Sequence, residues 1–429
     1  MILTIKADGK TEKIELNELQ NRSGTTDFET EKIVRDIIDD VKENGDEAVK
    51  KYMLKFDGIV PEKMVLTKED MKLSYERIDS EFRDAINNAA VNIRKYHEKQ
   101  FQKGYENKDE NGSVLGQVIR GLSKVGIYVP GGTASYPSTV LMNAIPAAIA
   151  GVEEIIMVTP PPKPGWDNHQ ILATAYIAGV DMVILSGGAQ AVAALAYGTE
   201  TFPRVDKIVG PGNIYVATAK RLLYGLVDIE MIAGPSEILI IADSTANPTF
   251  IAADLLSQAE HDKQSAAILL TTDENIAEET AKQVELRLQN LSRKGIATEA
   301  IKKNGLIVIC NSEEEMFNLS NEIAPEHLEI LTEDPMGQLP LVKNAGSVFL
   351  GPWSPEPLGD YYSGTNHVLP TSGTARYASP LGVYDFIKRM SYTYYSEESL
   401  RIAKDDIIKI GSAEGLTAHV ESVKVRFEE

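Results

Sequence analysis

Four of the six histidines stand near other side chains that could do chemistry. The pairs are Gln258 with His261, Glu326 with His327, Asp360 with His367, and Glu414 with His419. Imidazole is the usual base near neutral pH, and imidazoles with carboxylates suit Zn²⁺ or a similar divalent ion. Four such settings would be unusual for purely structural histidines. The other two histidines lie in ordinary polar helical contexts, and His97 is expected at the surface.

The stretch Ser257–Asp262 places two polar side chains on the inner side of a predicted helix. The helix is expected to begin at Asn247-Pro248, where Asn can cap and Pro suits the first position. Gln258 falls within the apolar stripe that includes Leu255, and His261 lies beside it. A buried polar group without a partner is costly, so either the protein or a metal ion or ligand must satisfy both. Satisfaction within the protein is the commoner case.

Glu326 and His327 follow Pro325 at a predicted junction between a loop and a strand. Adjacent residues at such a junction can line one cleft, where the imidazole acts as a base. The carboxylate would then act as a second base or orient water. The alternative is an acid that caps the backbone beside a surface histidine.

Asp360 and His367 lie in residues 351–382, a segment that is rich in Gly and Pro and shows no periodicity. A long segment of this kind is usually functional or disordered, and its aromatic and apolar residues argue against disorder. A carboxylate with imidazoles suits a divalent metal ion, but no local ligand spacing supports that interpretation. Glu414 and His419 are equally weak when taken alone.

Three glycine-rich turns follow predicted strands, at Pro130–Thr133, Ser186–Gln190 and Gly210–Asn213. A turn between a strand and a helix offers backbone N–H groups and a helix N-terminus to phosphates. None of these turns contains the G-x-G-x-x-G pattern of dinucleotide-binding folds. Tight turns without any ligand are an equally good interpretation of the composition.

Short apolar runs, each followed by Gly or Pro and then by a small-residue helical stretch, recur around these turns. The expected strands there are residues 125–129, 154–158, 182–185 and 207–209. With few charged residues nearby, the pattern predicts parallel strands covered by helices on both faces, and hence an α/β domain. The same pattern resumes beyond it, with expected strands at residues 238–242, 266–270, 306–310 and 327–331.

These elements predict a discontinuous organisation, in which one α/β domain is inserted into another. The expected segments are a short strand and an extended arm at residues 1–25, a first α/β domain at residues 26–120 and 237–375, an inserted domain at residues 121–236, and a tail at residues 376–429. The tail is expected to hold a helix, a loop and then a strand at Val420–Arg426.

The composition limits the kinds of partner. The chain of 429 residues has a formal net charge of −20, which disfavours nucleic-acid and anionic-membrane partners because phosphate binding needs basic surface. Its one cysteine, Cys310, excludes an internal disulfide and a Cys-rich zinc site. No apolar run approaches the length of a membrane span, and the first residues lack the apolar core of a signal peptide. A cytoplasmic protein is therefore expected.

Several longer motifs together resemble the histidinol dehydrogenases, the zinc- and NAD-dependent enzymes of histidine biosynthesis. The resemblance covers nearly the whole chain and shows no departure at a position that the family uses for chemistry. It is carried by Tyr128–Gly132, Val209–Val216, Ala233–Glu237, Ser257–Asp262, Ala324–Leu328, Asp360-Tyr361 with Gly364–Pro370, and Glu414–His419.

The resemblance implies a role for each matching residue. The implied zinc ligands are Gln258, His261, Asp360 and His419, and the implied catalytic acid–base pair is Glu326 and His327. The implied substrate contacts are Ser236, His367 and Glu414, joined by Gln258, His261, His327, Asp360 and His419. The implied NAD contacts are Tyr128, Gln190 and Asn213. The family fold has two incomplete Rossmann-like domains and small terminal domains, in an intertwined homodimer whose active sites take tail residues from the partner chain.

The family oxidises L-histidinol to L-histidine through L-histidinal with two NAD. In the first step a base must take the hydroxyl proton, and His327 suits that role. In the second step water must add to the aldehyde, and Glu326 suits its activation. Cys310 ends a predicted apolar run and is expected in the core, so a hydrated aldehyde is favoured over a thiohemiacetal. Zn²⁺ is not redox-active and is expected to hold substrate nitrogen and polarise the site.

Other functions remain compatible with the sequence. A relative with the same zinc site could oxidise another small polar alcohol, such as a sulfonated diol, although Ser236, His367 and Glu414 favour histidinol. A metal-dependent hydrolase could use Glu326 to activate water, and it would reduce no NAD with any alcohol. A non-catalytic NAD- or metal-binding protein is disfavoured because no site residue has been lost.

Overall fold

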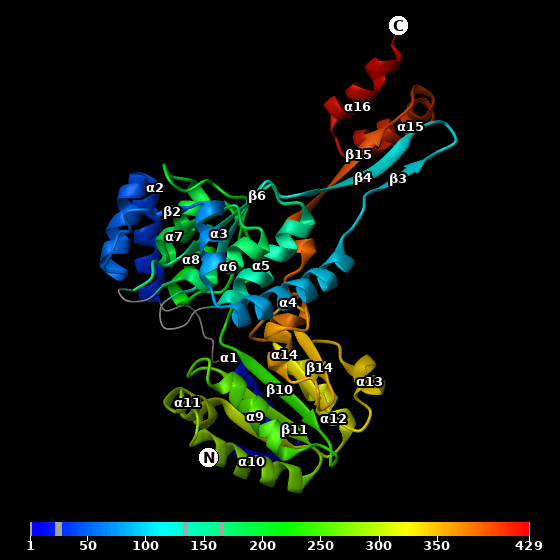
Figure 1. The fold of residues 1–429 in the computed structure, drawn as a ribbon. Coiled ribbons are helices and arrows are strands. Elements are labelled where there is room, and N and C mark those ends of the chain that lie inside the picture. The colour runs from blue at the N-terminus through cyan, green and yellow to red at the C-terminus, as the bar shows by residue number, and fades with distance from the viewer. Residues whose placement is uncertain (1, 22–27, 132–135, 164–166, 429) are drawn as a thin grey trace. The chain divides into compact units, whose positions relative to one another are not determined.

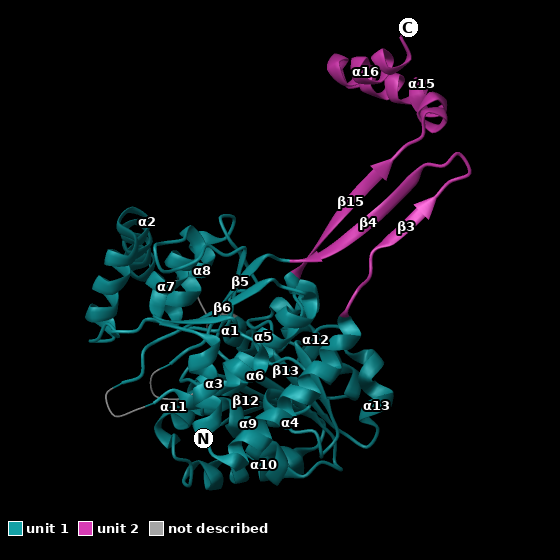
Figure 2. Cartoon of the chain, turned by 45° about the horizontal axis from the view of Figure 1, so that its top comes forward, with its two compact units in different colours: residues 1–100, 122–386 teal, residues 101–121, 387–429 magenta. Residues whose placement is uncertain are grey.

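The computed structural model of the chain describes residues 2–21, 28–131, 136–163 and 167–428. The chain divides into two compact units, one of residues 1–100 and 122–386 and the other of residues 101–121 and 387–429 (Figure 2). The first unit holds two six-stranded sheets, and the second holds a three-stranded sheet. None of the described helices is both long and apolar enough to cross a membrane.

One six-stranded sheet is parallel throughout and has helices on both faces (Figure 1). Its order is β1 (Leu3–Lys6), β12 (Gly305–Ile309), β11 (Ala266–Thr271), β10 (Glu237–Ala242), β13 (His327–Leu331) and β14 (Ser347–Leu350). Alternate residues point to opposite faces, so Ile238 and Ile240 pack on one side of β10 and Leu239 and Ile241 on the other. Helices α9 (Pro248–Ala259), α10 (Glu274–Leu288) and α11 (Lys294–Asn304) cover the first face, and helices α1 (Thr11–Asn21) and α12 (Glu313–Ile323) cover the second.

The N-terminal segment begins with the short strand that the sequence predicted, but a helix follows it in place of the extended arm. Strand β1 extends this sheet, with Leu3 paired to Leu306, and helix α1 follows it. Leu16 and Leu19 of α1 are buried against the second face of the sheet. One short apolar spacing is too little periodicity to predict a helix, so only its packing on the sheet reveals it. Residues 22–25 of the expected arm lie outside the described residues.

The other six-stranded sheet is parallel except at one edge. Its order is β2 (Val65–Leu66), β7 (Met182–Leu185), β6 (Glu154–Thr159), β5 (Lys124–Tyr128), β8 (Lys207–Val209) and β9 (Asp228–Ile229), and only β2 is antiparallel to its neighbour. Helices α7 (Gly188–Tyr197) and α8 (Ile214–Leu223) pack on one face, while α5 (Pro137–Ala150) packs against β5 and β6 and beside α6 (His169–Ala178). The eight strands expected in the two sheets are confirmed, each within one residue of its expected ends.

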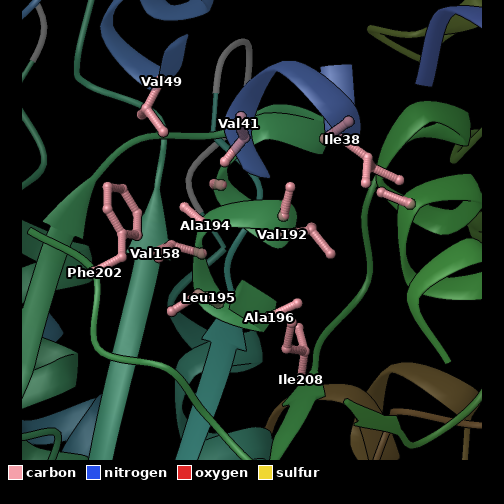
Figure 3. Packing of buried hydrophobic residues seen from close by; sticks show 14 of the residues in the cluster. Ile38, Val41, Val49, Val158, Val192, Ala194, Leu195, Ala196, Phe202 and Ile208 are labelled. Carbon is pink, nitrogen blue, oxygen red and sulfur yellow. The ribbon is translucent and has the colours of Figure 1, made fainter. Parts of the chain in front are cut away.

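Residues 28–77 lie on this second sheet, not on the sheet built from residues 237–375 as expected. Helix α2 (Phe28–Phe56) packs against α7 and α8, helix α3 (Lys68–Arg77) packs against α6, and β2 pairs with β7. Ile38 and Val41 of α2 meet Val192 and Leu195 of α7 in one core (Figure 3). The spacing of such residues identifies the buried side of a helix but carries no information about which sheet it covers.

The second unit contains the C-terminal tail. Strand β4 (Val114–Gly121) pairs antiparallel with β3 (Tyr105–Lys108) and with β15 (Ile387–Tyr394), and helices α15 (Glu397–Ala413) and α16 (Thr417–Lys424) follow. The expected strand at Val420–Arg426 is wrong, because these residues lie in α16 and a 3₁₀ turn. Val420 is buried, and its side chain lies close to Gly411 of α15. Packing on a neighbouring helix therefore outweighs the β propensity of the valines.

His97 ends helix α4 (Ser80–His97) and is fully buried, so the expectation that it lies at the surface is wrong. Its Nδ1 donates a hydrogen bond to the carbonyl oxygen of Ile93 at 2.8 Å. Its Nε2 accepts one from Nδ2 of Asn366 at 3.3 Å, which also fixes the residue next to His367. Burial lowers the pKa of His97, and hydrogen bonding to the backbone of Ile93 and Leu381 offsets part of this effect.

The stability of the folded protein should therefore depend on the protonation of His97. The unfolded chain takes up this proton at a higher pH than the folded protein, so stability is complete above the ordinary pKa and is lost as the pH falls below it. Relative to His97→Gln, the wild type should lose unfolding free energy as the pH falls below the ordinary pKa of histidine. Denaturant unfolding of both proteins between about pH 7.5 and 5 measures the difference, and a constant difference would contradict the prediction.

Candidate active site

A cavity of about 850 Å³ in the first unit gathers most of the candidate residues. The candidates on its wall are Ser236, Gln258, His261, Glu326, His327, Asp360 and His367. They come from separate stretches of the chain, so only the tertiary fold brings them together. Glu414 and His419 are not on this wall; they belong to the second unit, where both are exposed.

The cavity lies at the amino edge of the parallel sheet that contains β10 and β13. Ser236 directly precedes β10, and Glu326 and His327 stand where the adjacent strand β13 begins. The other sheet contributes its carboxyl edge, because Pro211 follows β8 and also lines the cavity. Ligands in open α/β sheets usually bind at carboxyl edges, so the second sheet follows the common arrangement and the first departs from it.

Gln258 and His261 reach the cavity from the end of helix α9. Gln258 is 1% exposed, as its place in the apolar stripe predicts. Its side chain lies beside the carboxyl of Glu356, but its Nε2 makes no hydrogen bond of ordinary geometry among the described residues. Helix α9 ends at Ala259, so His261 lies beyond the helix in which it was expected. His261 is exposed on the cavity wall. A buried amide with an unused polar atom fits a ligand site.

His327 is buried, which rules out the alternative of a surface histidine. Its Nδ1 lies 2.9 Å from the carbonyl oxygen of Glu237. A carbonyl oxygen can only accept, so Nδ1 carries the proton and Nε2 keeps its lone pair. Nε2 has no hydrogen-bond partner among the described residues and lies 3.6 Å from Oε1 of Glu356. Burial lowers the pKa of His327 to about 4, and His261 and His367 add to the effect, so the imidazole is neutral and able to accept a proton.

Glu326 is held by the backbone of the neighbouring strand. Its Oε2 accepts a hydrogen bond from the backbone N–H of Glu237 at 2.8 Å and lies 3.6 Å from Nδ1 of His327. Burial raises the pKa of Glu326 well above its ordinary value, and the carboxylate of Glu237 adds to this. A carboxyl group with a raised pKa on a cavity wall is suited to take up and return a proton.

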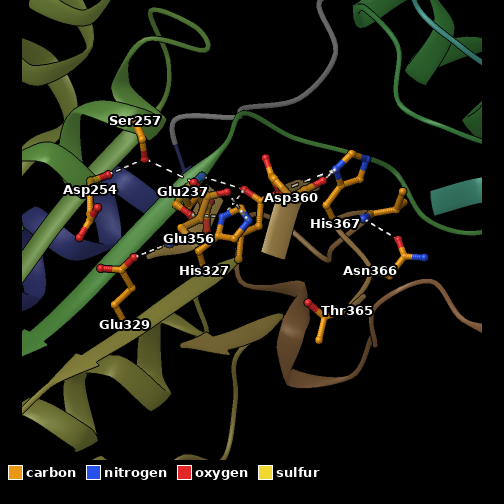
Figure 4. Close-up of polar contacts among 12 residues, drawn as sticks. Glu237, Asp254, Ser257, His327, Glu329, Glu356, Asp360, Thr365, Asn366 and His367 are labelled. Atoms are coloured by element: carbon orange, nitrogen blue, oxygen red, sulfur yellow. Dashed lines mark hydrogen bonds and ion pairs between the residues drawn. The ribbon is translucent and has the colours of Figure 1, made fainter. Parts of the chain in front are cut away.

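Sequence reasoning missed Glu356, which stands beside His327 and Asp360 (Figure 4). It begins the short helix α14 (Glu356–Tyr361) within the segment expected to be irregular, and it is 1% exposed. Its backbone N–H donates to Oε1 of Glu329 at 2.8 Å, and Ser257 Oγ donates to its Oε2 at 3.3 Å. The spacing of Glu356 and Asp360, four residues apart and therefore one helical turn, was the signal available in the sequence.

The acids of this cluster repel one another. Burial raises the pKa of Glu356 to about 8, with Asp360 as the next cause. Burial likewise raises the pKa of Asp360 to about 6. His327, Glu356 and Asp360 each offer a ligand atom within 4.8 Å of the others. A divalent cation would offset both the repulsion and the lost solvation, so the residues present fit a metal ion.

His367 lines the same cavity from the segment after α14. Its Nδ1 donates to the backbone carbonyl oxygen of Asp360 at 3.2 Å, which leaves Nε2 as an acceptor. Burial lowers the pKa of His367 to about 4. The His367 ring is therefore neutral, and its hydrogen bond to the backbone of Asp360 fixes its orientation.

The expected NAD contacts lie together at the carboxyl edge of the second sheet. Tyr128 ends β5, and its hydroxyl accepts from the N–H of Gly188 at 3.0 Å, close to Gln190 in the first turn of α7. Asn213 caps α8 by accepting from the N–H groups of Tyr215 and Val216.

None of the three expected NAD contacts is on the cavity wall, although Pro130, Pro211 and Gly212 of the same turns are. In the turn Pro130–Thr133, Gly132 and Thr133 lie outside the described residues. The side chains of Tyr128 and Asn213 thus have hydrogen-bond partners within the protein, which agrees with the interpretation that these turns bind no ligand. The same turns nevertheless reach the cavity through Pro130, Pro211 and Gly212.

Cys310 is 4% exposed in the core of the first sheet, where the sequence predicted it. Burial raises the pKa of its thiol to about 12. A buried thiol that stays protonated is not a nucleophile.

Comparison with known proteins relates the chain to one family. The family model for histidinol dehydrogenase matches residues 20–427. A histidinol dehydrogenase of Clostridium acetobutylicum is 55% identical over 410 residues, which cover 96% of this chain and 95% of that protein. One of Listeria innocua is 53% identical over 423 residues, 98% of each chain. The crystal structure of histidinol dehydrogenase from Elizabethkingia anophelis has a TM-score of 0.93 at 40% identity and covers 99% of this chain and 98% of that one.

Proposed function

The chain belongs to the histidinol dehydrogenase family and is therefore an oxidoreductase that acts on histidinol, and we propose that it converts L-histidinol to L-histidine through L-histidinal with Zn²⁺ and NAD. The observation that carries the proposal is the cavity in which a neutral histidine, a protonatable glutamate and a cluster of acids meet. The product is an amino acid, so the activity belongs to histidine biosynthesis.

Gln258, His261 and Asp360 of this chain would hold the Zn²⁺, with His419 supplied by the partner chain of a homodimer. Support comes from the acids Asp360 and Glu356, whose repulsion a cation relieves. When bound, the ion would hold substrate nitrogen and polarise the site. Glu414 of the partner chain and Ser236 and His367 of this chain would contact the substrate.

His327 would act in the first oxidation. Its Nε2 keeps a lone pair because Nδ1 donates to Glu237, and it would take the hydroxyl proton of the alcohol. The turns at Tyr128, Gln190 and Asn213 would hold NAD, which would supply a hydride acceptor for each of the two oxidations.

Glu326 would act in the second oxidation. Its carboxylate would take a proton from water as the oxygen bonds to the aldehyde carbon, which gives the hydrate whose oxidation yields the acid. The backbone N–H of Glu237 holds Oε2 in place for this step. Cys310 would take no part, because its thiol is buried and protonated.

The match to the histidinol dehydrogenase family over nearly the whole chain supports histidinol over a sulfonated diol as the substrate.

Removing the metal should abolish turnover and leave most of the fold stability intact. The proposed ligands sit on a chain with two large cores of its own, so the ion is not needed to assemble them. The assay follows NADH formed from L-histidinol before and after chelation, with the unfolding transition measured on the same samples. Two NADH per L-histidinol and recovery on adding Zn²⁺ are expected. Full activity in metal-free protein would sink the zinc proposal.

A further inference from the structure

A buried ion pair lies outside the acidic cluster, at the turn after β8. Lys220 of α8 and Glu230, which follows β9, have side chains that are only 3% and 2% exposed, and Nζ lies 2.6 Å from Oε1. Burying two charges is costly unless their geometry is good and further hydrogen bonds satisfy them. Oε2 of Glu230 has no hydrogen-bond partner among the described residues, so the ion pair with Lys220 is the main interaction that offsets the cost of burying that carboxylate.

Both members of the pair bind the backbone of one residue. Nζ of Lys220 donates to the carbonyl oxygen of Gly210 at 3.0 Å, and the N–H of Gly210 donates to Oε1 of Glu230 at 2.8 Å. The backbone N–H and carbonyl groups of Gly210 are thus bound by Glu230 and Lys220, which also form an ion pair with each other. Hydrogen bonds to charged groups are about twice as strong as those between neutral groups, so the ion pair restrains the backbone of Gly210.

This restraint matters because the backbone conformation of Gly210 is unusual. Its φ is +110°, and a Cβ at this position would lie 2.1 Å from the carbonyl oxygen of Tyr128. Only glycine fits there, and glycine has no side chain with which to fix its own backbone. The turn continues into Pro211 and Gly212, which line the cavity, and then into Asn213, which caps the helix that carries Lys220.

We propose that the Lys220–Glu230 pair is a positioning device that fixes the turn Gly210–Asn213 for binding of the dinucleotide. Lys220 does not line the cavity, whereas Glu230 does, and both act on the turn through the backbone of Gly210. The inference rests on the proposed use of NAD and adds to it the residues that set the geometry of one binding turn. A turn displaced by about 1 Å can cost on the order of 10²-fold in a binding or catalytic step.

Lys220→Met tests this proposal, because methionine keeps the unbranched apolar stem and removes the ammonium group. The KM for NAD and the NAD affinity measured by titration calorimetry should weaken by about 10- to 100-fold. The KM for L-histidinol and the zinc content should stay at wild-type values, which a general loss of structure would not allow.

Lys207→Met is the matched control. Lys207 lies on β8 itself, its side chain is 6% exposed, and it pairs with Asp228 at 2.9 Å and donates to the carbonyl oxygen of Asp385 at 2.8 Å. It does not bind the Gly210 turn. This variant should lose thermal stability but keep the wild-type NAD affinity.

The double variant Lys220→Met with Glu230→Gln removes both charges, so it should fold even if the single variant does not. It still leaves the carbonyl oxygen of Gly210 without its donor and should show the same weakening for NAD. Wild-type NAD affinity in either folded Lys220 variant, or an equal loss in Lys207→Met, would overturn the inference. Absence of NAD binding by the wild type would instead overturn the proposed function, and the inference with it.

Discussion

His327→Gln should slow the oxidation of L-histidinol by roughly 10²- to 10⁴-fold, the usual cost of losing a positioned base. The carbonyl oxygen of Glu237 holds Nδ1 of His327, which leaves Nε2 open to accept a proton. Glutamine can still donate to that carbonyl, but it has no basic nitrogen for the hydroxyl proton. The rates of NADH formation are measured separately from L-histidinol and from supplied L-histidinal, and the alcohol should suffer more.

Glu326→Gln should show the opposite bias in the same two assays. The amide keeps an acceptor for the N–H of Glu237 but cannot take a proton from water, so oxidation of the aldehyde should fall more than oxidation of the alcohol. Glu329→Gln is the control, because Glu329 is a fully buried acid on the same strand that does not line the cavity. Equal slowing of both half-reactions by Glu326→Gln would show that the division of labour between the two residues is wrong.

His261→Ala and His419→Ala should each abolish turnover, and their co-expression should restore roughly a quarter of the wild-type activity. Each substitution removes a proposed zinc ligand from both sites of a homodimer. His261 belongs to the first unit and His419 to the second, which the proposal assigns to the partner's site. In a mixed dimer one site then receives both lesions and the other receives neither. With random pairing, about half of the dimers are mixed and each has one intact site.

Co-expression of Gln258→Ala with His261→Ala is the matched control for this experiment. Both residues come from the same stretch at the end of α9, so every site in a mixed dimer carries one lesion and activity should stay absent. The variants must be made in the same cells, because the chains of the proposed intertwined dimer would exchange slowly after folding. Mixed dimers that are isolated with two affinity tags and remain inactive would show that each site is built within one chain.

Local periodicity made much of the fold readable from the sequence. The apolar runs at residues 154–158 and 327–331 became β6 and β13 because strands buried on both faces must be apolar throughout. The stripe of α9 placed Gln258 inside, since helical geometry alone decides which residues share a side. The sequence did not show where that helix ends, so the expectation that His261 lies within it was wrong.

The sequence by itself determined the four central strands of each six-stranded sheet, the buried place of Cys310 and the family, because these depend on the period of the backbone and on motifs within short stretches. Only the tertiary structure decided that α2 covers the second sheet, that His97 is buried against Asn366, and that Glu356 joins His327 and Asp360. Each of these depends on contacts between residues far apart in the chain. Their free energy comes from burial and from paired charges, which no local spacing records.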